Sequence, residues 1–287
     1  MFAIFKRELK AYFLTPIGYI YMGLFLLLTG IFYFFDNMLS GSSRFTGFLG
    51  SILLFYLFAI PLLTMRLFSE EKKQKTDQLL LTSPVSITGI VSGKFLAAMA
   101  VYCGTLLFTV AYAVVIAFYG DLLVWETLGS YIGYIFLGAA YISVGVFVSA
   151  VTENQLTAAV VSFFALMLIW LIDPVSQIVP SDTRTGIISA AILLAALLLF
   201  LYLNTKNWVI VLGAAIIGGL AIAGFYFFKR DVFFGFIRKF LGWFSLNRRY
   251  QPFSTGLLKF DSLIYYSSFA GLFLFLTVRL IEKRRWN

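Results

Sequence analysis

The chain contains no histidine and a single cysteine, and charged residues make up only 12% of its 287 residues. Without histidine, the sequence excludes histidine-ligated metal sites, Ser–His catalytic triads and HExxH metalloprotease helices. With only Cys103, an intrachain disulfide is excluded, and its position inside an apolar segment argues against redox chemistry. The charged fraction is about half that of a typical soluble domain, which leaves too little polar sequence for a separate soluble domain.

Long apolar runs fill most of the sequence. Hydrophobic residues make up 61% of the chain, and the mean hydropathy is +0.93. A helix needs roughly 20 apolar residues to cross a bilayer. The runs predict about eight spans, at residues 17–35, 48–68, 88–118, 128–150, 156–178, 186–203, 208–228 and 263–281. We therefore predict an all-α, polytopic membrane protein whose single transmembrane domain covers residues 1–287.

Two stretches outside the spans have the composition of membrane-surface segments. Residues 1–16 mix aromatic and aliphatic residues with Lys6, Arg7 and Lys10, and no signal-peptide cleavage pattern follows. This pattern predicts an amphipathic helix at the membrane surface that ends before Pro16. Residues 229–262 are aromatic and basic, which predicts short helices at a membrane surface, and the preceding 185–228 form a predicted helical hairpin.

The distribution of Lys and Arg predicts the orientation of the chain. With the N-terminus inside and an even number of spans, thirteen of the 22 Lys and Arg residues lie inside and nine outside. Residues 229–262 hold seven of those nine, and they weaken the bias. We nevertheless expect both termini in the cytoplasm and residues 229–262 on the extracytoplasmic side, because the N-terminal clusters agree with one another.

Ionisable residues avoid the middle of the predicted spans. Intramembrane charges mark proton relays and ion-coupled carriers, so their scarcity argues against those classes. Lys94 lies close to the start of a span and is interpreted as an anchor at the inner surface. Glycines are instead frequent in the fourth span, where close packing against neighbouring helices is the expected role of Gly129, Gly133, Gly138 and Gly145.

Residues 69–83, called the charged segment, interrupt the apolar sequence between the second and third spans. Six of the eight residues from Glu70 to Asp77 are charged, and three leucines follow at 79–81. Ser83 before Pro84 is typical of a helix N-cap, so we expect the next span to begin there. The residues alone favour two interpretations equally: a short helix that docks onto a soluble partner, and an ordinary solvated loop.

The nearby sequence "GIVSGKF" does not form a phosphate-binding loop. Three residues rather than four separate its glycines, and Phe95 stands where Ser or Thr is required. We therefore expect no catalytic residue, no metal and no cofactor bound by this chain. The net charge of +9 comes from residues at the ends of spans, so no nucleic-acid partner is expected.

The stretch "RLFSEEKKQKTDQLLLTSPVSITGIVSGKFLAA" resembles the segment between the second and third spans of type-2 ABC transporter permeases. That family pattern has an acidic pair, Gly-Thr, a Glu, paired leucines, a Pro and a later Gly-Lys. The matching residues are Glu70, Glu71, Thr76, Leu80, Leu81, Pro84, Gly93 and Lys94. Lys75 stands where the pattern has Gly, and Gln78 stands where it has Glu.

Three further stretches carry the same resemblance. They are "FKRELKAYFLTPIGYI", similar to the N-terminal elbow helix, "GSYIGYIFLGAAYISVGVFVSAVTENQLTAA", similar to the fourth span, and "FDSLIYYSSFAGLFLFLTVRLIEKRRW", similar to the last span. In this order they resemble the gliding-motility-associated subfamily. Its members commonly have a core of six spans, to which residues 185–228 would add a hairpin.

The resemblance implies a role for the charged segment as a cytoplasmic coupling helix that inserts into a separate ABC ATPase subunit. The residues implied in coupling are Glu70, Glu71, Thr76, Asp77, Leu80, Leu81 and Pro84, and further contacts at the inner side are expected from Glu8, Glu153, Arg284 and Arg285. ATP and Mg²⁺ would be bound by the partner ATPase. The other implied partners are a second permease chain, the lipid bilayer and an extracytoplasmic accessory protein.

The resulting hypothesis is a permease subunit of an ATP-driven exporter in the cell membrane. Two alternatives remain at this point. One is a scaffold that passes ATPase strokes to an extracytoplasmic partner without transport, and the other is a channel or an ion-coupled carrier.

Overall fold

Helices form the whole of the secondary structure in the described residues of the computed structural model, which are 1–43, 45–78, 85–228 and 233–286. The predicted all-α class is confirmed. The chain divides into two compact units, each described by itself. Unit 1 comprises Met1–Leu168 and Arg249–Asn287, and unit 2 comprises Ile169–Arg248.

The N-terminal helices of unit 1 follow from the position of proline. Helix α1 (Phe2–Leu14) ends at Thr15, which is extended (φ −111°, ψ 152°) because a residue before proline disfavours the helical conformation. Pro16 then occupies the first turn of α2, where its missing N–H costs nothing. The following elements are α2 (Pro16–Tyr33), the π-helix η1 (Phe34–Leu39), α3 (Phe45–Ile52), the 3₁₀ turn η2 (Leu53–Phe55) and α4 (Tyr56–Thr64).

The charged segment begins with a short helix, α5 (Ser69–Lys73). The next helix is α7 (Ile87–Phe108), and it begins three residues later than the sequence predicted. Its N-cap is Ser86 rather than Ser83, because the Ser86 side chain accepts a hydrogen bond from the Gly89 N–H at 3.2 Å. The rest of unit 1 consists of α8 (Val110–Tyr119), α9 (Val124–Val151), the first part of α10 (Gln155–Ile178), most of α14 (Leu246–Ser254) and α15 (Phe260–Trp286).

Seven helical segments in the described part of the chain are long and apolar enough to cross a membrane. They are Pro16–Leu39, Gly47–Thr64, Ile87–Tyr119, Val124–Val151, Gln155–Ile178, Thr183–Thr205 and Phe260–Arg285. The remaining predicted span, 208–228, corresponds to α12 (Trp208–Phe228), an apolar helix of 21 residues. In the described residues, seven of the eight predicted spans thus fall on full-length candidates.

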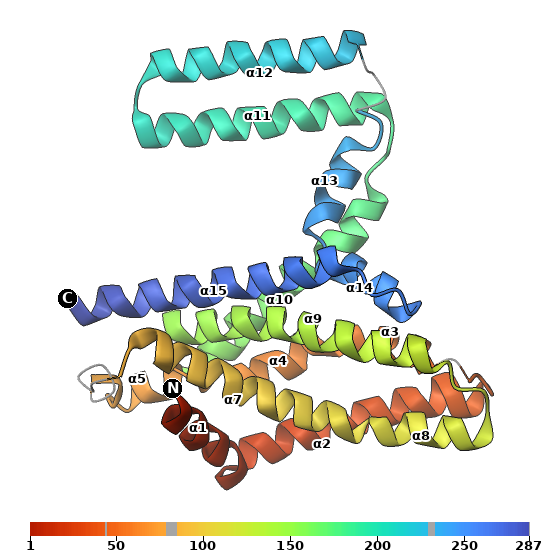
Figure 1. The fold of residues 1–287 in the computed structure, drawn as a ribbon. Coiled ribbons are helices and arrows are strands. Elements are labelled where there is room, and N and C mark those ends of the chain that lie inside the picture. The colour runs from red at the N-terminus through yellow and green to blue at the C-terminus, as the bar shows by residue number, and fades with distance from the viewer. Residues whose placement is uncertain (44, 79–84, 229–232, 287) are drawn as a thin grey trace. The chain divides into compact units, whose positions relative to one another are not determined.

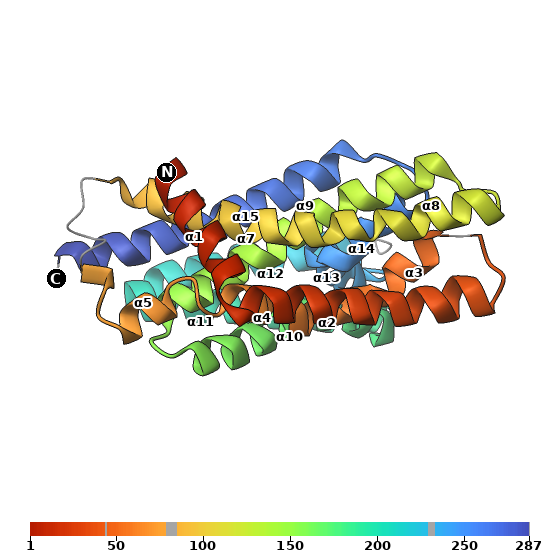
Figure 2. The same cartoon turned by 90° about the horizontal axis from the view of Figure 1, so that it is seen from below.

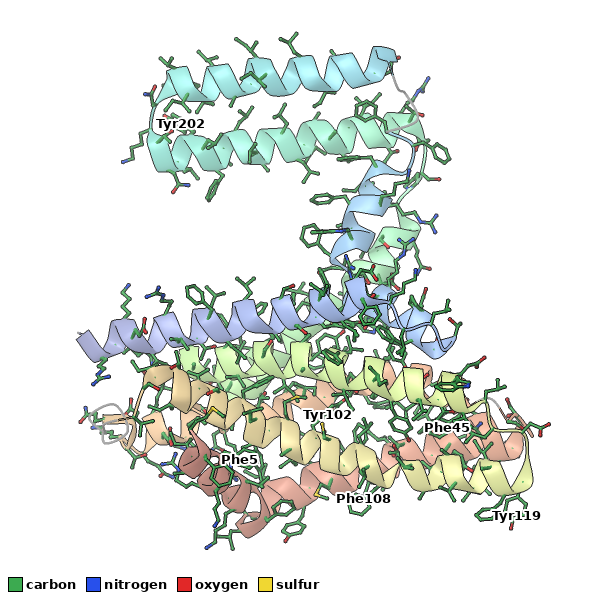
Figure 3. The ribbon with its side chains drawn as sticks, viewed as in Figure 1. Phe5, Phe45, Tyr102, Phe108, Tyr119 and Tyr202 are labelled. Atoms are coloured by element: carbon green, nitrogen blue, oxygen red, sulfur yellow. The ribbon has the colours of Figure 1, made fainter. Side chains whose placement is uncertain are left out.

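The core of unit 1 is built around α9, the most buried of these spans. Its glycines lie where side chains from other helices press against it: a Cβ at Gly145 would overlap Thr64 of α4, and one at Gly138 would overlap the ring of Tyr102 of α7. Small residues allow such close approach, and the resulting van der Waals packing is one of the forces that associate helices in lipid. Tyr102 lies inside the bundle and donates a hydrogen bond to the Tyr134 carbonyl at 2.8 Å (Figure 3). The predicted packing role of these glycines is confirmed.

Both termini of unit 1 lie at the same end of the bundle (Figures 1 and 2). Helices α1 and α5 and the C-terminal end of α15 mark this end, which we call the α5 end. The opposite end holds α8 and the start of α9, where Gly256 contacts Glu126. Helix α15 therefore runs from the opposite end back to the α5 end.

The direction of α10 within unit 1 follows from its neighbours. Helix α10 starts beside the end of α9 and passes α4, where the Phe163 and Phe58 rings are 5.0 Å apart, so it runs away from the α5 end. The chain re-enters unit 1 at the opposite end, where Phe253 packs against Gly133 of α9.

Unit 2 consists of the end of α10, a hairpin of α11 (Thr183–Thr205) and α12, and the short helix α13 (Phe236–Phe244). The hairpin coincides with the predicted 185–228. Asp182 caps α11 by accepting a hydrogen bond from the Thr185 N–H. Helix α13 places the rings of Phe236, Phe240 and Phe244 in one stripe, which suits a helix at a membrane surface.

Candidate functional site: a charge cluster that joins α1, α5 and α7

An acidic residue lies on the buried stripe of α1. Ile4, Glu8 and Tyr12, spaced by four residues, are the buried positions of this helix. Helix α1 packs on α7 at Gly93, where an added Cβ would lie 3.0 Å from the Met1 carbonyl oxygen. The close approach brings the Glu8 carboxylate against α7.

Lys94 of α7 receives this carboxylate. Its side chain is 1% exposed, and its ammonium nitrogen lies 3.0 Å from Glu8 Oε1 and 3.0 Å from Glu71 Oε2. It also donates a hydrogen bond to the Leu67 carbonyl at 2.5 Å and lies 5.0 Å from the centre of the Phe68 ring. The interpretation of Lys94 as a surface anchor is therefore wrong. It is a buried cation that is satisfied by partners from α1, α5 and the turn before α5.

Arg7 completes the cluster from the exposed side. Its guanidinium lies 2.6 Å from Glu8 Oε1 and 2.5 Å from Glu71 Oε1. The charge cluster, defined as Arg7, Glu8, Glu71 and Lys94, contains two cations and two carboxylates. Burial alone would raise the pKa of Glu8, but Lys94 and Arg7 together hold that pKa below its usual value. The opposite charges neutralise one another, and their ion pairs join α1, α5 and α7.

Arg66 forms a second link between α1 and the charged segment. Its side chain is 6% exposed, lies 3.7 Å from Glu70 Oε2 and donates a hydrogen bond to the Thr15 hydroxyl. Its guanidinium also lies 5.1 Å from the centre of the Tyr12 ring, and the Tyr12 hydroxyl donates to the Leu63 carbonyl. Through Arg66, Tyr12 and Thr15 at the end of α1 are thus linked to Glu70 at the start of the charged segment.

The turn after α5 contains the position at which the family pattern has Gly. Lys75, which stands where the pattern has Gly, has a φ of +57°. This is the left-handed region that glycine adopts without a steric penalty. The Thr76 N–H and hydroxyl both bond to the Glu71 carbonyl, at 2.9 and 3.3 Å. These bonds close the turn.

The structure brings together some of the predicted site residues. Glu8 and Glu71 meet at Lys94, and Glu70 meets Arg66. Asp77 accepts a hydrogen bond from the Gln78 N–H at 3.0 Å. Leu80, Leu81 and Pro84 lie outside the described residues.

The remaining predicted contacts lie at the C-terminal ends of α9 and α15. Arg284 donates a hydrogen bond to the Val151 carbonyl at 3.4 Å, whereas Glu153 and Arg285 are exposed.

Sequence reasoning missed Lys94 and Arg66 as members of the site. The sequence did contain a signal at Glu8, the partner of Lys94. Glu8 falls on the apolar stripe of an amphipathic helix, where a carboxylate requires a buried cation. The identity of that cation depends on which helix packs against α1, and no local pattern specifies this.

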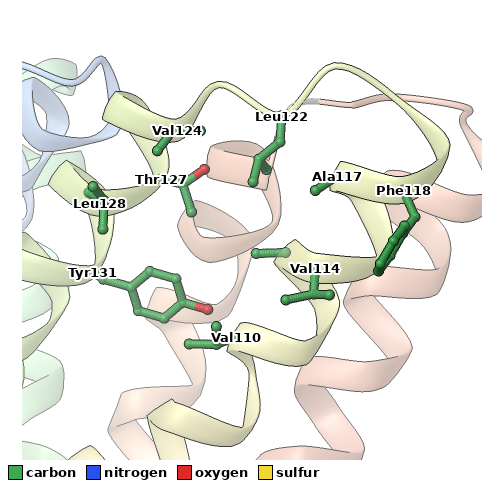
Figure 4. Close-up of a pocket in the computed structure, with 10 residues that line it drawn as sticks. Val110, Val114, Ala117, Phe118, Leu122, Val124, Thr127, Leu128 and Tyr131 are labelled. Carbon is green, nitrogen blue, oxygen red and sulfur yellow. The ribbon is translucent and has the colours of Figure 1, made fainter.

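The opposite end of unit 1 contains an apolar pocket of about 360 Å³ between α8 and α9 (Figure 4). The Tyr131 hydroxyl in its wall is already hydrogen-bonded to Thr109 at 2.9 Å. The lining is otherwise mostly aliphatic, and its residues are Val110, Ala113, Val114, Ala117, Phe118, Leu122, Val124, Thr127, Leu128 and Tyr131. A pocket of this kind offers space to apolar groups but no charged group to orient a ligand, so the charge cluster remains the candidate functional site.

Taken together, the apolar helices and the charged segment between two of them define a polytopic helical membrane protein. Residues 24–232 match the family model of the ABC-2 family transporter proteins. The chain belongs to this family, whose membrane subunits act as permeases and typically work with an ABC ATPase, dimerise and lie in lipid. No curated protein matches the chain.

Proposed function

We propose that the chain is the membrane-spanning subunit of an ATP-driven exporter and that its charged segment couples ATPase closure to movement of the spans. The observation that carries the proposal is the charge cluster. Through Glu71, the charged segment is ion-paired both to Arg7 of α1 and to the buried Lys94 of α7. A displacement of α5 would therefore be transmitted to α1 and α7 through these ion pairs, in addition to the covalent connection along the chain.

The remaining parts of the machine follow from this assignment. ATP and Mg²⁺ are bound by a separate ATPase subunit, whose groove receives Leu80 and Leu81. A second permease chain completes the pathway, and both termini lie in the cytoplasm because they share the α5 end with the charged segment. The gliding-motility-associated subfamily, which the sequence resembles, and an extracytoplasmic accessory partner belong to the same proposal.

Co-purification with the ATPase tests the coupling role. Burying two leucines in a groove contributes about 3 to 6 kcal/mol, so replacing both Leu80 and Leu81 by Asp should abolish co-purification while the chain remains in the membrane. A matched control is available in Leu257 and Leu258, an exposed leucine pair (59% and 49%) in the loop at the opposite end of unit 1. The same double replacement there should leave co-purification intact.

Two results would contradict this proposal. One is ATPase co-purification that persists in the Leu80→Asp, Leu81→Asp variant. The other is equal loss in both double variants, which would indicate general damage rather than a docking site at the charged segment.

A further inference from the structure

The C-terminal end of α9 accepts hydrogen bonds from two other helices. The last carbonyls of a helix have no partner within it, and they carry the negative end of the helix dipole. Here Lys72 of α5 donates to the Ala150 carbonyl and, at 3.2 Å, to the Thr152 carbonyl. Arg284 of α15 donates to the carbonyl between them, that of Val151. Two cations thus share three consecutive carbonyls.

The N-terminal end of α5 is also bound to α9. The Ser149 side chain is fully buried, and its hydroxyl accepts hydrogen bonds from the Phe68 and Ser69 N–H groups at 3.0 and 3.3 Å. The same hydroxyl donates to the Met65 carbonyl at 3.1 Å. Helix α5 is therefore attached to α9 at its start by Ser149 and near its end by Lys72.

The surroundings of Lys72 disfavour its charge. Its ammonium group is half-buried, and burial, followed by repulsion from Arg284, lowers its pKa to about 8 although Glu153 and Asp77 act in the other direction. A cation whose pKa is lowered on folding favours the unfolded chain at neutral pH. A neutral side chain of similar length without a donor, such as methionine, would remove the bonds that Lys72 donates to the Ala150 and Thr152 carbonyls.

We propose that the hydrogen bonds of Lys72 and Ser149 attach α9 to the charged segment, so that a displacement of this segment moves α9 together with α4 and α7. Segment 65–86 is covalently joined to α4 and α7, and the Lys72 and Ser149 bonds add α9 to them. Helix α9 packs through Gly145 on α4, through Gly138 on α7 and through Gly133 on Phe253 at the opposite end. Movement that enters at Lys72 is thereby carried along the most buried span of the molecule.

This inference rests on the proposed function, in which an ATPase displaces the charged segment. It is tested by distance measurements with paired spin labels in the permease–ATPase complex in lipid nanodiscs, in a Cys103→Ser background. Labels at Leu39 and Trp125 report on α9, and labels at Leu39 and Tyr119 report on α8, the continuation of α7. All three side chains are well exposed, at 67%, 80% and 90%.

Addition of a non-hydrolysable ATP analogue should change both distances in the unaltered complex. Lys72→Met should reduce the change between Leu39 and Trp125 to less than half and leave the change between Leu39 and Tyr119 intact. Lys72→Arg should restore the lost movement, because it retains a cation that can donate to the carbonyls. Lys73→Met, which removes the neighbouring exposed charge, should behave like the unaltered protein.

Retention of the full Leu39–Trp125 change in Lys72→Met would overturn the inference, as would an equal loss for both label pairs. ATPase co-purification is followed in every variant, so these outcomes leave the proposed function standing. If the unaltered complex shows no nucleotide-dependent change in either pair, the proposed function fails and the inference fails with it.

Discussion

Replacing Lys94 by methionine tests the charge cluster at its most buried member. Methionine has a similar length, so the change removes the charge without leaving a large cavity. Lys94 is 1% exposed and pairs with Glu8 and Glu71 at 3.0 Å each. Removing one partner of a buried ion pair typically costs about 3 to 5 kcal/mol, because the other charge is left uncompensated.

Arg7 moderates this cost, since it contacts both carboxylates from the exposed side. We therefore expect Lys94→Met to destabilise unit 1 by about 3 kcal/mol, at the lower end of that range. Glu8→Gln preserves the shape and leaves Lys94 paired with Glu71, so about 1 to 2 kcal/mol is expected. The double variant should be more stable than the sum of the two predicts, by at least about 1 kcal/mol, because neither charge is then left alone.

Thermal unfolding in detergent measures these differences, with a thiol-reactive dye that reports on Cys103. This residue is the only cysteine of the chain, and it is partly buried in α7. A loss of 3 kcal/mol corresponds to a decrease in Tm of about 6 to 12 °C by the scaling for chains of 150 to 250 residues. The control Lys73→Met alters an exposed charge on α5 and should remain within about 0.5 kcal/mol.

The reasoning would be refuted if Lys94→Met melted within the range of Lys73→Met, or if the Lys94→Met and Glu8→Gln effects were additive. The pH dependence provides a further check. The pKa of Glu8 is lowered on folding from 4.5, so its contribution is fully present above that value and is lost as the pH falls through the lowered pKa. Glu8→Gln should therefore reduce the acid sensitivity of the protein.

Three further predictions concern topology, catalysis and pH. A cysteine at the exposed Thr255, in a Cys103→Ser background, should react with an impermeant thiol reagent added to intact cells, because the loop of Thr255 lies at the end opposite α5. Labelling only after permeabilisation would place this loop on the cytoplasmic side. The purified chain alone should not hydrolyse ATP, and ATPase activity should require a separate ATPase subunit in a complex that contains two copies of each protein. ATPase activity of the purified chain, or a different stoichiometry in a native mass measurement, would contradict this prediction. Raising the pH from 7 to 9.5 should deprotonate Lys72, whose pKa is about 8, and weaken its bonds to the α9 carbonyls. The nucleotide-dependent movement of α9 should then decrease in the unaltered complex but persist in Lys72→Arg, because the charge of arginine does not titrate in this range. Equal behaviour of the two proteins would contradict the role of this charge.

The number, length and order of the membrane segments were largely predictable, because the bilayer imposes a local requirement. Each span needs about 20 consecutive apolar residues, and this requirement can be checked without knowledge of the neighbours. Each of the eight predicted spans falls on a helix, and the predicted 208–228 corresponds to α12 (Trp208–Phe228). The close-packed glycines of α9 were predictable for the same reason, since small residues in an apolar helix indicate close contact without specifying the partner.

The position of the charged segment was also determined by the sequence, because six charges between two spans must remain outside the hydrocarbon core. The chemistry of this end was decided only by tertiary structure. Whether Lys94 lies at the membrane surface or in a buried ion pair depends on Glu8 and Glu71, which are 86 and 23 positions away in the chain and are brought within 3.0 Å by the packing of α1 and α5 on α7. Likewise, nothing local marks Ser149 as the partner of Phe68 and Ser69. A charged side chain carries a free-energy cost that depends on its surroundings, and those surroundings are created by helices distant in sequence.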